Sequence, residues 1–470
     1  MRKNILKLIP LMVIMLPSFM FASSGGEHHL GNELPLFSII PFVGILLSIA
    51  VLPLLAPQFW HHNFGKISAF WALMFLIPFW MWKGSHDTAY EFLHVMLLEY
   101  VPFIILLLAL FTVSGGIRLK GSLVGSPKVN LIILIIGTAL ASWMGTTGAA
   151  MLLIRPLIRA NKWRKHNVHV VIFFIFLVAN IGGSLTPLGD PPLFLGFLHG
   201  VNFFWTTKAM LVPMLFTVAI LLVVFFVLDS FYYKKETNYP DNTNGEKFGI
   251  EGSINFVLLI GVVASVLMSG FWHPQFGYSI MGIHLELQNI LRDLLLLCLT
   301  VLSWKITKLE IRKANGYTWF PILEVAKLFA GIFITIIPAI AILKAGTHGA
   351  LKSVVGAVTD GNGNPIDMMY FWLTGILSSF LDNAPTYLVF FNTAGGNAET
   401  LMTTLSSTLL AISMGAVFMG ANTYIGNAPN FMVKSISEEN DIKMPSFFGY
   451  MAWSVAILIP IFVVVSLIFF

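Results

Sequence analysis

The sequence predicts an all-α polytopic membrane protein made of two inverted repeats, each with a re-entrant hairpin and a broken helix. Three observations support this prediction. Of the 470 residues, 57% are hydrophobic and only 10% are charged, whereas soluble domains have roughly 45–50% apolar and about 25% charged residues. Apolar segments of spanning length recur along the whole chain, and two interrupted stretches in the first half match two in the second half. The lipid bilayer is therefore the first expected partner.

The N-terminus is expected to be a signal peptide over residues 1–23. Three basic residues precede an apolar run over 8–21, a pattern typical of secretory signals and not of a structural helix. An uncleaved first span is the alternative. Residues 24–34 are then expected to form an exposed N-terminal tail.

Ten segments have the length and composition of membrane spans, which need about 20 mostly apolar residues. They are 36–56, 66–83, 97–115, 168–199, 208–231, 253–270, 288–304, 321–343, 402–436 and 446–469. Gly and Pro interrupt 168–199 and 402–436, so these two are expected to be broken helices. Basic residues gather in alternate connections, as they do in cytoplasmic loops, and this alternation agrees with the count.

Two further apolar segments, 129–160 and 369–396, are too short for two complete spans and are interrupted midway by polar or Gly/Pro clusters. We expect re-entrant hairpins, which dip into the membrane and return to the same side. Five spans separate them, so they enter from opposite faces. The predicted fold thus has about 10 spans and 2 hairpins, with inverted repeats over 35–231 and 253–470 joined by a cytoplasmic linker over 232–252.

The two broken segments align when the chain is shifted by 237 positions. Residues 179–194 then fall on 416–431, with Gly183 on Gly420 and Thr186 on Thr423, and the same shift places 140–148 on 377–385. Interrupted apolar segments at corresponding positions of two halves indicate the binding site of a secondary transporter.

The interruptions offer groups that could hold a cation. A helix broken inside the bilayer has freed carbonyl and amide groups that need partners, and hard cations such as Na⁺ prefer oxygen ligands. A first site is expected to combine Thr146 and Thr147 at one hairpin tip with Asn180, Ser184, Thr186 and Asp190. A second is expected to combine Asp382 and Asn383 at the other tip with Asn422, Thr423, Asn427 and Asn430.

Asp190 and Asp382 are the strongest candidates, and both are proposed as Na⁺ ligands. They fall in the breaks near mid-membrane, where a charge costs at least ~2.5–3.5 kcal/mol, so that an intramembrane acid is a functional hypothesis by default. A carboxyl group removed from water is harder to ionise and can hold either a proton or a cation. The alternative is that either aspartate only caps the N-terminus of a half-helix.

These motifs resemble the ion transporter superfamily. The stretches Asn-Ile-Gly-Gly-Ser-Leu-Thr-Pro-Leu-Gly-Asp-Pro-Pro (180–192) and Leu-Asp-Asn-Ala-Pro-Thr (381–386) are similar to those of NhaD-type Na⁺/H⁺ antiporters and of the related citrate and arsenite carriers. The resemblance covers nearly the whole mature chain. It implies a scaffold part that mediates homodimerisation and a transport part, holding both hairpins and both broken helices, that moves like an elevator.

The leading functional hypothesis is a Na⁺/H⁺ antiporter of the bacterial inner membrane, with Na⁺ as the transported or coupling ion and no organic cofactor. Dicarboxylate carriers of this superfamily have Ser-Asn-Thr at both hairpin tips, whereas this chain has Gly-Thr-Thr at 145–147 and Asp-Asn-Ala at 382–384. An aspartate there would repel a dianion by roughly 4 kcal/mol at 4 Å for unit charges at an effective dielectric of 20. The alternative is a Na⁺- or H⁺-coupled symporter of citrate or a dicarboxylate.

Other classes are disfavoured. The basic residues behind the net charge of +5 lie in short runs between apolar segments, so no nucleic-acid partner is expected. An intramembrane aspartyl protease would need glycine at Pro187, and no zinc-hydrolase or nucleotide-binding motif is present, so no enzyme is expected. A passive channel would keep the repeats but needs no alternating hairpins. The single Cys298 excludes an intramolecular disulfide.

Overall fold

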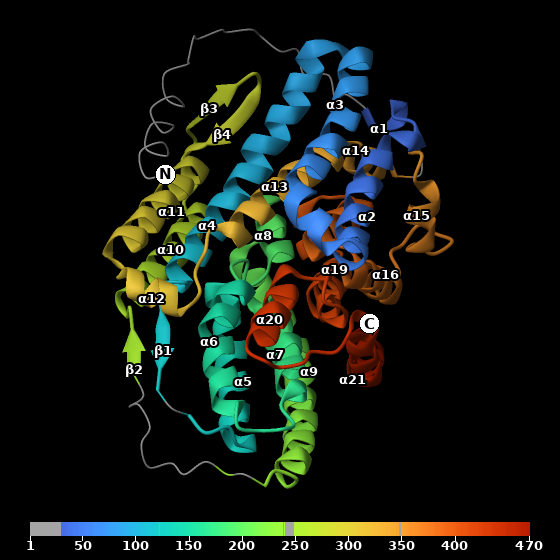
Figure 1. Ribbon diagram of the computed structural model, residues 1–470. Coiled ribbons are helices and arrows are strands. Elements are labelled where there is room, and N and C mark those ends of the chain that lie inside the picture. Colours follow the sequence, from blue (N-terminus) through green and yellow to red (C-terminus); the bar gives the residue numbers. More distant parts are fainter. Residues whose placement is uncertain (1–29, 122, 238, 240–248, 347–348) are drawn as a thin grey trace.

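A computed structural model describes residues 30–121, 123–237, 239, 249–346 and 349–470 (Figure 1). The signal peptide expected over 1–23 lies outside the described residues, as do residues 238 and 240–248 of the linker expected over 232–252. Almost all regular structure in the described part is helical, as the composition predicts.

The helices of the first half are α1 (Leu30–Glu33), η2 (Leu36–Ile39), α2 (Ile40–Leu55), α3 (Pro57–Val95), η3 (Met96–Tyr100), α4 (Val101–Ser114), α5 (Pro127–Met144), α6 (Thr146–Asn161), α7 (Val168–Leu177), η4 (Ile181–Leu185), α8 (Pro191–Leu198) and α9 (Phe203–Tyr233). Those of the second half are α10 (Ile254–Phe271), α11 (Leu287–Ile306), α12 (Leu309–Ala314), α13 (Phe320–Thr335), α14 (Ile337–Lys344), α15 (Lys352–Ala357), α16 (Asp367–Phe380), α17 (Asn383–Thr393), α18 (Ala398–Met402), α19 (Ser406–Met419), η7 (Gly420–Asn422), α20 (Ala428–Glu439) and α21 (Phe447–Phe469).

Two short antiparallel ladders lie at connections between helices. Strand β1 (Arg118–Lys120) pairs with β2 (Gly249–Glu251), so that Leu119 lies opposite Ile250. Strands β3 (Gly277–Ile280) and β4 (Ile283–Glu286) form a hairpin in the connection between α10 and α11. The β1–β2 pair ties the end of the linker to the connection that follows α4.

Helix α3 folds back on itself at one glycine. The helical run over 57–114 has 58 residues, about 87 Å at 1.5 Å per residue, far more than the hydrocarbon core of about 30 Å. Gly84 interrupts it with φ 83° and ψ 178°, a left-handed conformation that glycine adopts without steric cost. The run therefore contains two of the expected spans. The connection between them, expected as a loop, is helical beyond Gly84.

The number of spans differs from the expected ten. Among the described residues, seven helical segments are long and apolar enough to cross a membrane, or eight with the pair α13–α14, which bends by 41°. One of the seven, 57–114, merges two expected spans. Another is α5, which the sequence assigns to a hairpin. The two other expected spans, 288–304 and 402–436, are not among them. In the second, the apolar helical stretch ends at Asn422, at the break before α20.

The exposed tail expected over 24–34 is also corrected where the structure describes it. Residues 30–33 form α1, and Leu34 is buried. Gly31 packs so closely on α14 that a Cβ at this position would lie 1.9 Å from the Ala341 carbonyl oxygen. Residues 30–34 are therefore part of the fold, because a glycine and two leucines allow close helix packing.

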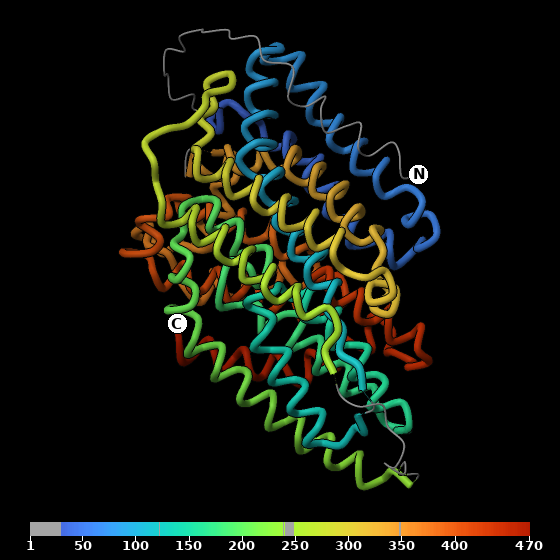
Figure 2. The backbone as a smooth tube through the Cα atoms, turned by 90° about the vertical axis from the view of Figure 1, so that its left-hand side faces the viewer, coloured from blue at the N-terminus to red at the C-terminus, as the bar shows by residue number. Residues whose placement is uncertain are grey.

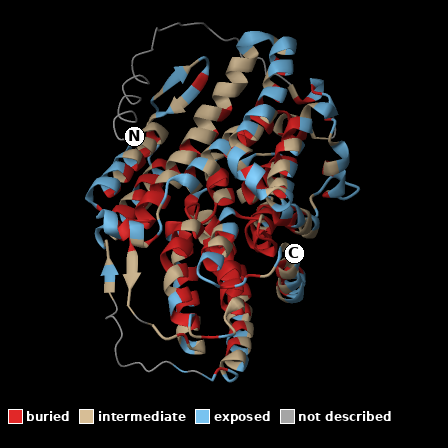
Figure 3. Ribbon diagram, in the orientation of Figure 1, coloured by how far each residue is buried: buried red, intermediate tan, exposed pale blue. Residues whose placement is uncertain are grey.

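The two halves interlock. In the outer layer α11 packs on α4 and α13 packs on α3, and around the centre α8 packs on α17 and α20 on α6. Figure 2 shows the first helices of each half at one side of the molecule and the hairpins and broken helices at the other. Buried residues are densest in α7 and α19, which lie in the interior (Figure 3).

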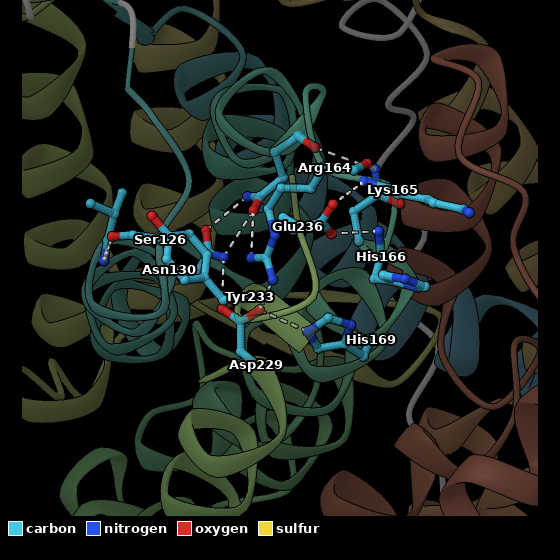
Figure 4. Close-up of polar contacts among 12 residues, drawn as sticks. Ser126, Asn130, Arg164, Lys165, His166, His169, Asp229, Tyr233 and Glu236 are labelled. Carbon is cyan, nitrogen blue, oxygen red and sulfur yellow. Dashed lines mark hydrogen bonds and ion pairs between the residues drawn. The ribbon is translucent and has the colours of Figure 1, made fainter. Parts of the chain in front are cut away.

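A buried ionic network holds the base of the first hairpin (Figure 4). The fully buried Asp229 of α9 accepts hydrogen bonds from Arg164 Nη2 (2.5 Å), His169 Nε2 (2.8 Å) and Asn130 Nδ2 (2.9 Å). Beside it, Glu236 accepts from the backbone amides that follow Arg164. In the second repeat the positions equivalent to Asn130, Arg164, His169 and Asp229 are, in that order, Asp367, Leu401, Ser406 and Ser466. The second repeat therefore has no equivalent network.

Replacing Asp229 with Asn is expected to destabilise the fold by about 3–5 kcal/mol, because it leaves the buried Arg164 guanidinium without its counter-charge. Glu438→Gln removes only the partly exposed partner of Lys434 and is expected to cost roughly 0.3–0.5 kcal/mol. Thermal unfolding of the purified variants in detergent measures both changes. Equal unfolding temperatures for the two variants would contradict the structural role of the network.

Candidate functional site

The tip of the first hairpin is a single residue between two helices. Helix α5 ends at Met144, Gly145 turns the chain with φ 79°, and α6 begins at Thr146. The Thr146 amide donates a hydrogen bond of 2.8 Å to the Gly189 carbonyl. The tip is thereby joined to the interruption between α7 and α8.

The tip of the second hairpin is formed by Leu381 and Asp382, between α16 and α17. The carboxylate of Asp382 accepts a hydrogen bond of 3.1 Å from the Ala384 amide and so caps α17. Asp190 precedes α8 in the same way but forms no such cap. The capping alternative therefore describes the half-buried Asp382 and does not describe Asp190.

In each repeat, a serine of the hairpin and a threonine of the broken helix form hydrogen bonds across the break. In the first, Ser142 Oγ donates to the Gly182 carbonyl (2.6 Å), and the Thr186 hydroxyl donates to the Ser142 carbonyl. In the second, Ser379 Oγ donates to the Met419 carbonyl (3.0 Å), and the Thr423 hydroxyl donates to the Ser379 carbonyl. All three positions of the second set lie 237 residues after those of the first. These bonds satisfy carbonyl groups that the interruption frees from the helix.

Sequence reasoning missed these two serines. Their signal is present in the alignment of the hairpins, because serine recurs at equivalent positions, Ser142 and Ser379, of the stretches 140–148 and 377–385. Thr186 and Thr423, which the sequence predicts as cation ligands, donate their hydroxyl protons to the serine carbonyls.

Two glycines let the chain cross itself within each break. A Cβ on Gly189 would lie 2.0 Å from the Gly183 carbonyl oxygen, and a Cβ on Gly426 would lie 2.6 Å from that of Gly420. No larger side chain fits such a backbone contact. The recurrence of glycine at these positions thus has a steric cause in both repeats.

The carboxylate of Asp190 is the centre of the site, and it is 1% exposed. Its Oδ1 accepts hydrogen bonds from Thr146 Oγ1 (3.1 Å) and Asn427 Nδ2 (2.9 Å), and its Oδ2 accepts from Asn383 Nδ2 (2.5 Å). None of these donors is charged. Among the described residues, no lysine, arginine or histidine forms an ion pair with Asp190.

The four residues of this cluster are two pairs of equivalent positions. Thr146 and Asn383 are 237 residues apart, and so are Asp190 and Asn427. Both hairpin tips and both breaks therefore meet at one point, and each repeat contributes the equivalent pair of positions to it. The sequence groups these residues into two separate sites; the structure joins members of both groups around one carboxylate.

A second set of amides surrounds this cluster. Asn180 Oδ1 accepts from Asn427 Nδ2 (3.2 Å), and Asn180 Nδ2 donates to Asn430 Oδ1 (2.6 Å). Asn430 Nδ2 donates to the carbonyls of Gly420 (2.8 Å) and Thr423 (2.9 Å). The two broken helices are thus tied to each other through side-chain amides.

Several buried oxygen atoms near the interruptions have no hydrogen-bond donor among the described residues. They are Asn383 Oδ1, Ser184 Oγ and Asn422 Oδ1. Asn383 is the most relevant of them, because its amide nitrogen already binds Asp190. Buried polar atoms normally have a hydrogen-bond partner. These oxygens lack one and can therefore accept a hydrogen bond or coordinate a cation. Thr147 lies apart from the cluster, on the wall of a neighbouring cleft.

That cleft, of about 100 Å³, leads to Asp190 from the side. Its walls are the first hairpin tip, the start of α8, the apolar faces of α4 and α13, and α20. It therefore lies at the boundary between the outer helices of the fold and the interlocked hairpins and breaks. Apart from Asp190, Thr146 and Thr147, its lining is apolar or glycine.

Paired helix breaks and hairpins around a buried acid define a polytopic membrane transporter. The model of the family described as "Putative citrate transport" matches residues 31–470. The chain belongs to this family. A comparison with curated proteins finds no match.

Gly189→Ala is expected to destabilise the break, since overpacking costs typically about 1–3 kcal/mol and the obstacle here is backbone. Gly361→Ala is the matched control, because a Cβ at Gly361 meets nothing within 4 Å. Thermal unfolding in detergent should show a lower midpoint for the first variant and no change for the second. An unchanged midpoint for Gly189→Ala would contradict the close crossing.

Proposed function

We propose that this protein is a secondary active transporter that exchanges Na⁺ for H⁺ across the bacterial inner membrane. One observation carries the proposal. The Asp190 carboxyl group is buried among neutral donors, and a buried charge without a counter-charge is strongly unfavourable. The group must therefore be protonated or hold a cation, and these are the two loaded states of an exchanger.

The surroundings of Asp190 suit a hard cation. Na⁺ prefers oxygen ligands, and the neighbours include Thr146 Oγ1 and the unpartnered Asn383 Oδ1. Rotation of the hydroxyl and amide groups would present further oxygens when the proton leaves. Asp382 adjoins Asn383 and caps α17, so we assign it a contribution to the negative potential at the tip and a candidate role as a second ligand.

The proposed movement is of the elevator type. The outer helices, including α4 and α13, would form a static scaffold through which two copies associate as a homodimer. Hairpins and broken helices would move together, since Asp190 binds Thr146, Asn383 and Asn427 and thus joins all four elements. The cleft between α4, α13 and the first tip lies at the boundary where such parts would slide.

The alternative is Na⁺- or H⁺-coupled symport of citrate or a dicarboxylate, which the family description favours. Three features support the antiporter over it. The cleft beside Asp190 is small and mostly apolar. Asp382 occupies the second tip, where a multiply charged anion would be repelled. No arginine or lysine among the described residues lines the cleft.

Proteoliposome assays separate the two functions. Addition of Na⁺ should dissipate an imposed pH gradient without any organic anion present. Uptake of labelled citrate, with no Na⁺-dependent dissipation in its absence, would contradict the antiporter and support the symporter.

Asp190→Asn is expected to reduce Na⁺-dependent dissipation of the pH gradient to the level of empty liposomes, because the amide neither ionises nor carries a proton. Asp382→Asn is expected to lose exchange as well, because it removes the proposed second ligand while asparagine can still cap α17. Asp360→Asn, in an exposed connection, is the control and should leave exchange unchanged. Activity of Asp190→Asn equal to that of the control would refute the assignment.

The apparent KM for Na⁺ is expected to rise as the pH falls, because a proton and Na⁺ compete for one carboxylate. For one competing proton, the limiting slope is about tenfold per pH unit. Initial rates over a series of Na⁺ concentrations and pH values measure it. A KM for Na⁺ independent of pH, with only the maximal rate changing, would exclude competition at a shared group.

A further inference from the structure

We infer that the groove between α9 and α21 holds an anionic phospholipid, with an acyl chain against the two helices and the phosphate at Lys234 and Lys235. This inference does not depend on which ion or anion the protein transports.

The groove is a hollow of about 760 Å³ on the outer surface. In the described part of the chain its walls are formed by α9 and α21, and all of these lining residues are apolar. Ala452 and Ala456, one helical turn apart on α21, leave the space that larger side chains would fill. The volume is in the range of sites for small organic ligands, about 300–1,000 Å³.

A regular stripe of side chains leads from this hollow to a positive charge. Val223, Val227 and Phe231 line the groove at intervals of four residues, and residues four apart share one helix face. Lys235 follows four residues later, in the turn after the end of α9. Its Nζ lies 4.0 Å from the centroid of the Phe231 ring, and Lys234 beside it is exposed.

The length of α9 places these lysines at the membrane surface. Its 31 residues extend about 46 Å, whereas the hydrocarbon core is about 30 Å thick and the headgroup layers bring the total to roughly 40–45 Å. The end of α9 therefore emerges from the hydrocarbon. Tyr232 and Tyr233 precede the lysines, and tyrosine is enriched at this interface.

Two acidic groups in the described residues near this end of α9, Asp229 and Glu236, already have hydrogen-bond donors. Asp229 binds Arg164, His169 and Asn130, and Glu236 binds two backbone amides (Figure 4). Among the described residues, neither Lys234 nor Lys235 has an acidic partner. The two ammonium groups are thus available to an external anion.

A phospholipid fits both ends of this surface. Basic clusters at the cytoplasmic ends of membrane helices attract anionic headgroups, and the hollow that begins one turn away accepts a hydrocarbon chain. Free phosphate would use the lysines and leave the groove unused. A second copy of the chain would need to bring a complementary ridge and an acidic group to the lysines.

The test uses the full-length protein in mixed micelles with phosphatidylglycerol or phosphatidylethanolamine, followed by native mass spectrometry. Wild type should retain phosphatidylglycerol in preference. The double variant K234Q/K235Q is expected to reduce this retention ~10- to 30-fold, as the loss of two surface cations implies. K305Q/K308Q removes an exposed basic pair at the end of α11 and should retain the lipid as wild type does.

A second pair of variants tests the groove itself. Ala456→Phe fills the hollow and leaves both lysines in place, so it should lose phosphatidylglycerol too. Val455→Phe, at an exposed position outside the groove, should not. Equal retention by K234Q/K235Q and K305Q/K308Q, full retention by Ala456→Phe, or displacement of the lipid by inorganic phosphate would each overturn the inference. So would efficient cross-linking of two copies through Ala456→Cys in native membranes, which would assign the groove to a dimer contact.

Discussion

The structure depends on one constraint, that helices interrupted inside a bilayer must find partners for their freed polar groups. The two breaks meet this constraint in the same way, through Ser142 and Thr186 in one repeat and Ser379 and Thr423 in the other. Backbone groups are thereby satisfied within each repeat. The amide and hydroxyl side chains that remain are free to face the carboxylate of Asp190, and this leaves a polar centre without any permanent positive charge.

The two repeats are equivalent at the centre of the site and differ at the base of the first hairpin. At the centre, equivalent positions converge, so the hairpin tips contribute Thr146 and Asn383 and the breaks contribute Asp190 and Asn427. Only one of these four residues, Asp190, carries an acid, so the cluster itself has one carboxylate. At the base of the first hairpin the symmetry is lost altogether, because the Arg164–Asp229 network has no counterpart in the second repeat. The ionic network is therefore specific to the base of the first hairpin.

Much of this arrangement could be predicted from the sequence, because the residues that interrupt the helices recur after 237 positions. This shift relates both hairpins and both broken helices, since glycine and proline at fixed positions mark where a helix must stop.

The sequence does not predict how the site residues are grouped. A shift along the chain compares repeats but does not say that Asn427 crosses to Asp190. The buried network is not predicted, because Arg164 lies in a run of basic residues between two apolar segments, a pattern typical of a cytoplasmic loop. Asp229 was the available signal, as an acid within an otherwise apolar segment. The helical continuation beyond Gly84 and the packing of residues 30–34 arise from tertiary contacts that local composition does not encode.

The most direct test of the central claim is a binding measurement without transport. Na⁺ added to the purified protein in weakly buffered solution should release a proton for each ion bound, and Asp190→Asn should abolish both the proton release and the binding. Na⁺ binding of unchanged affinity in Asp190→Asn, or binding without any release of protons across the pH range, would contradict a carboxyl group shared between the two ions.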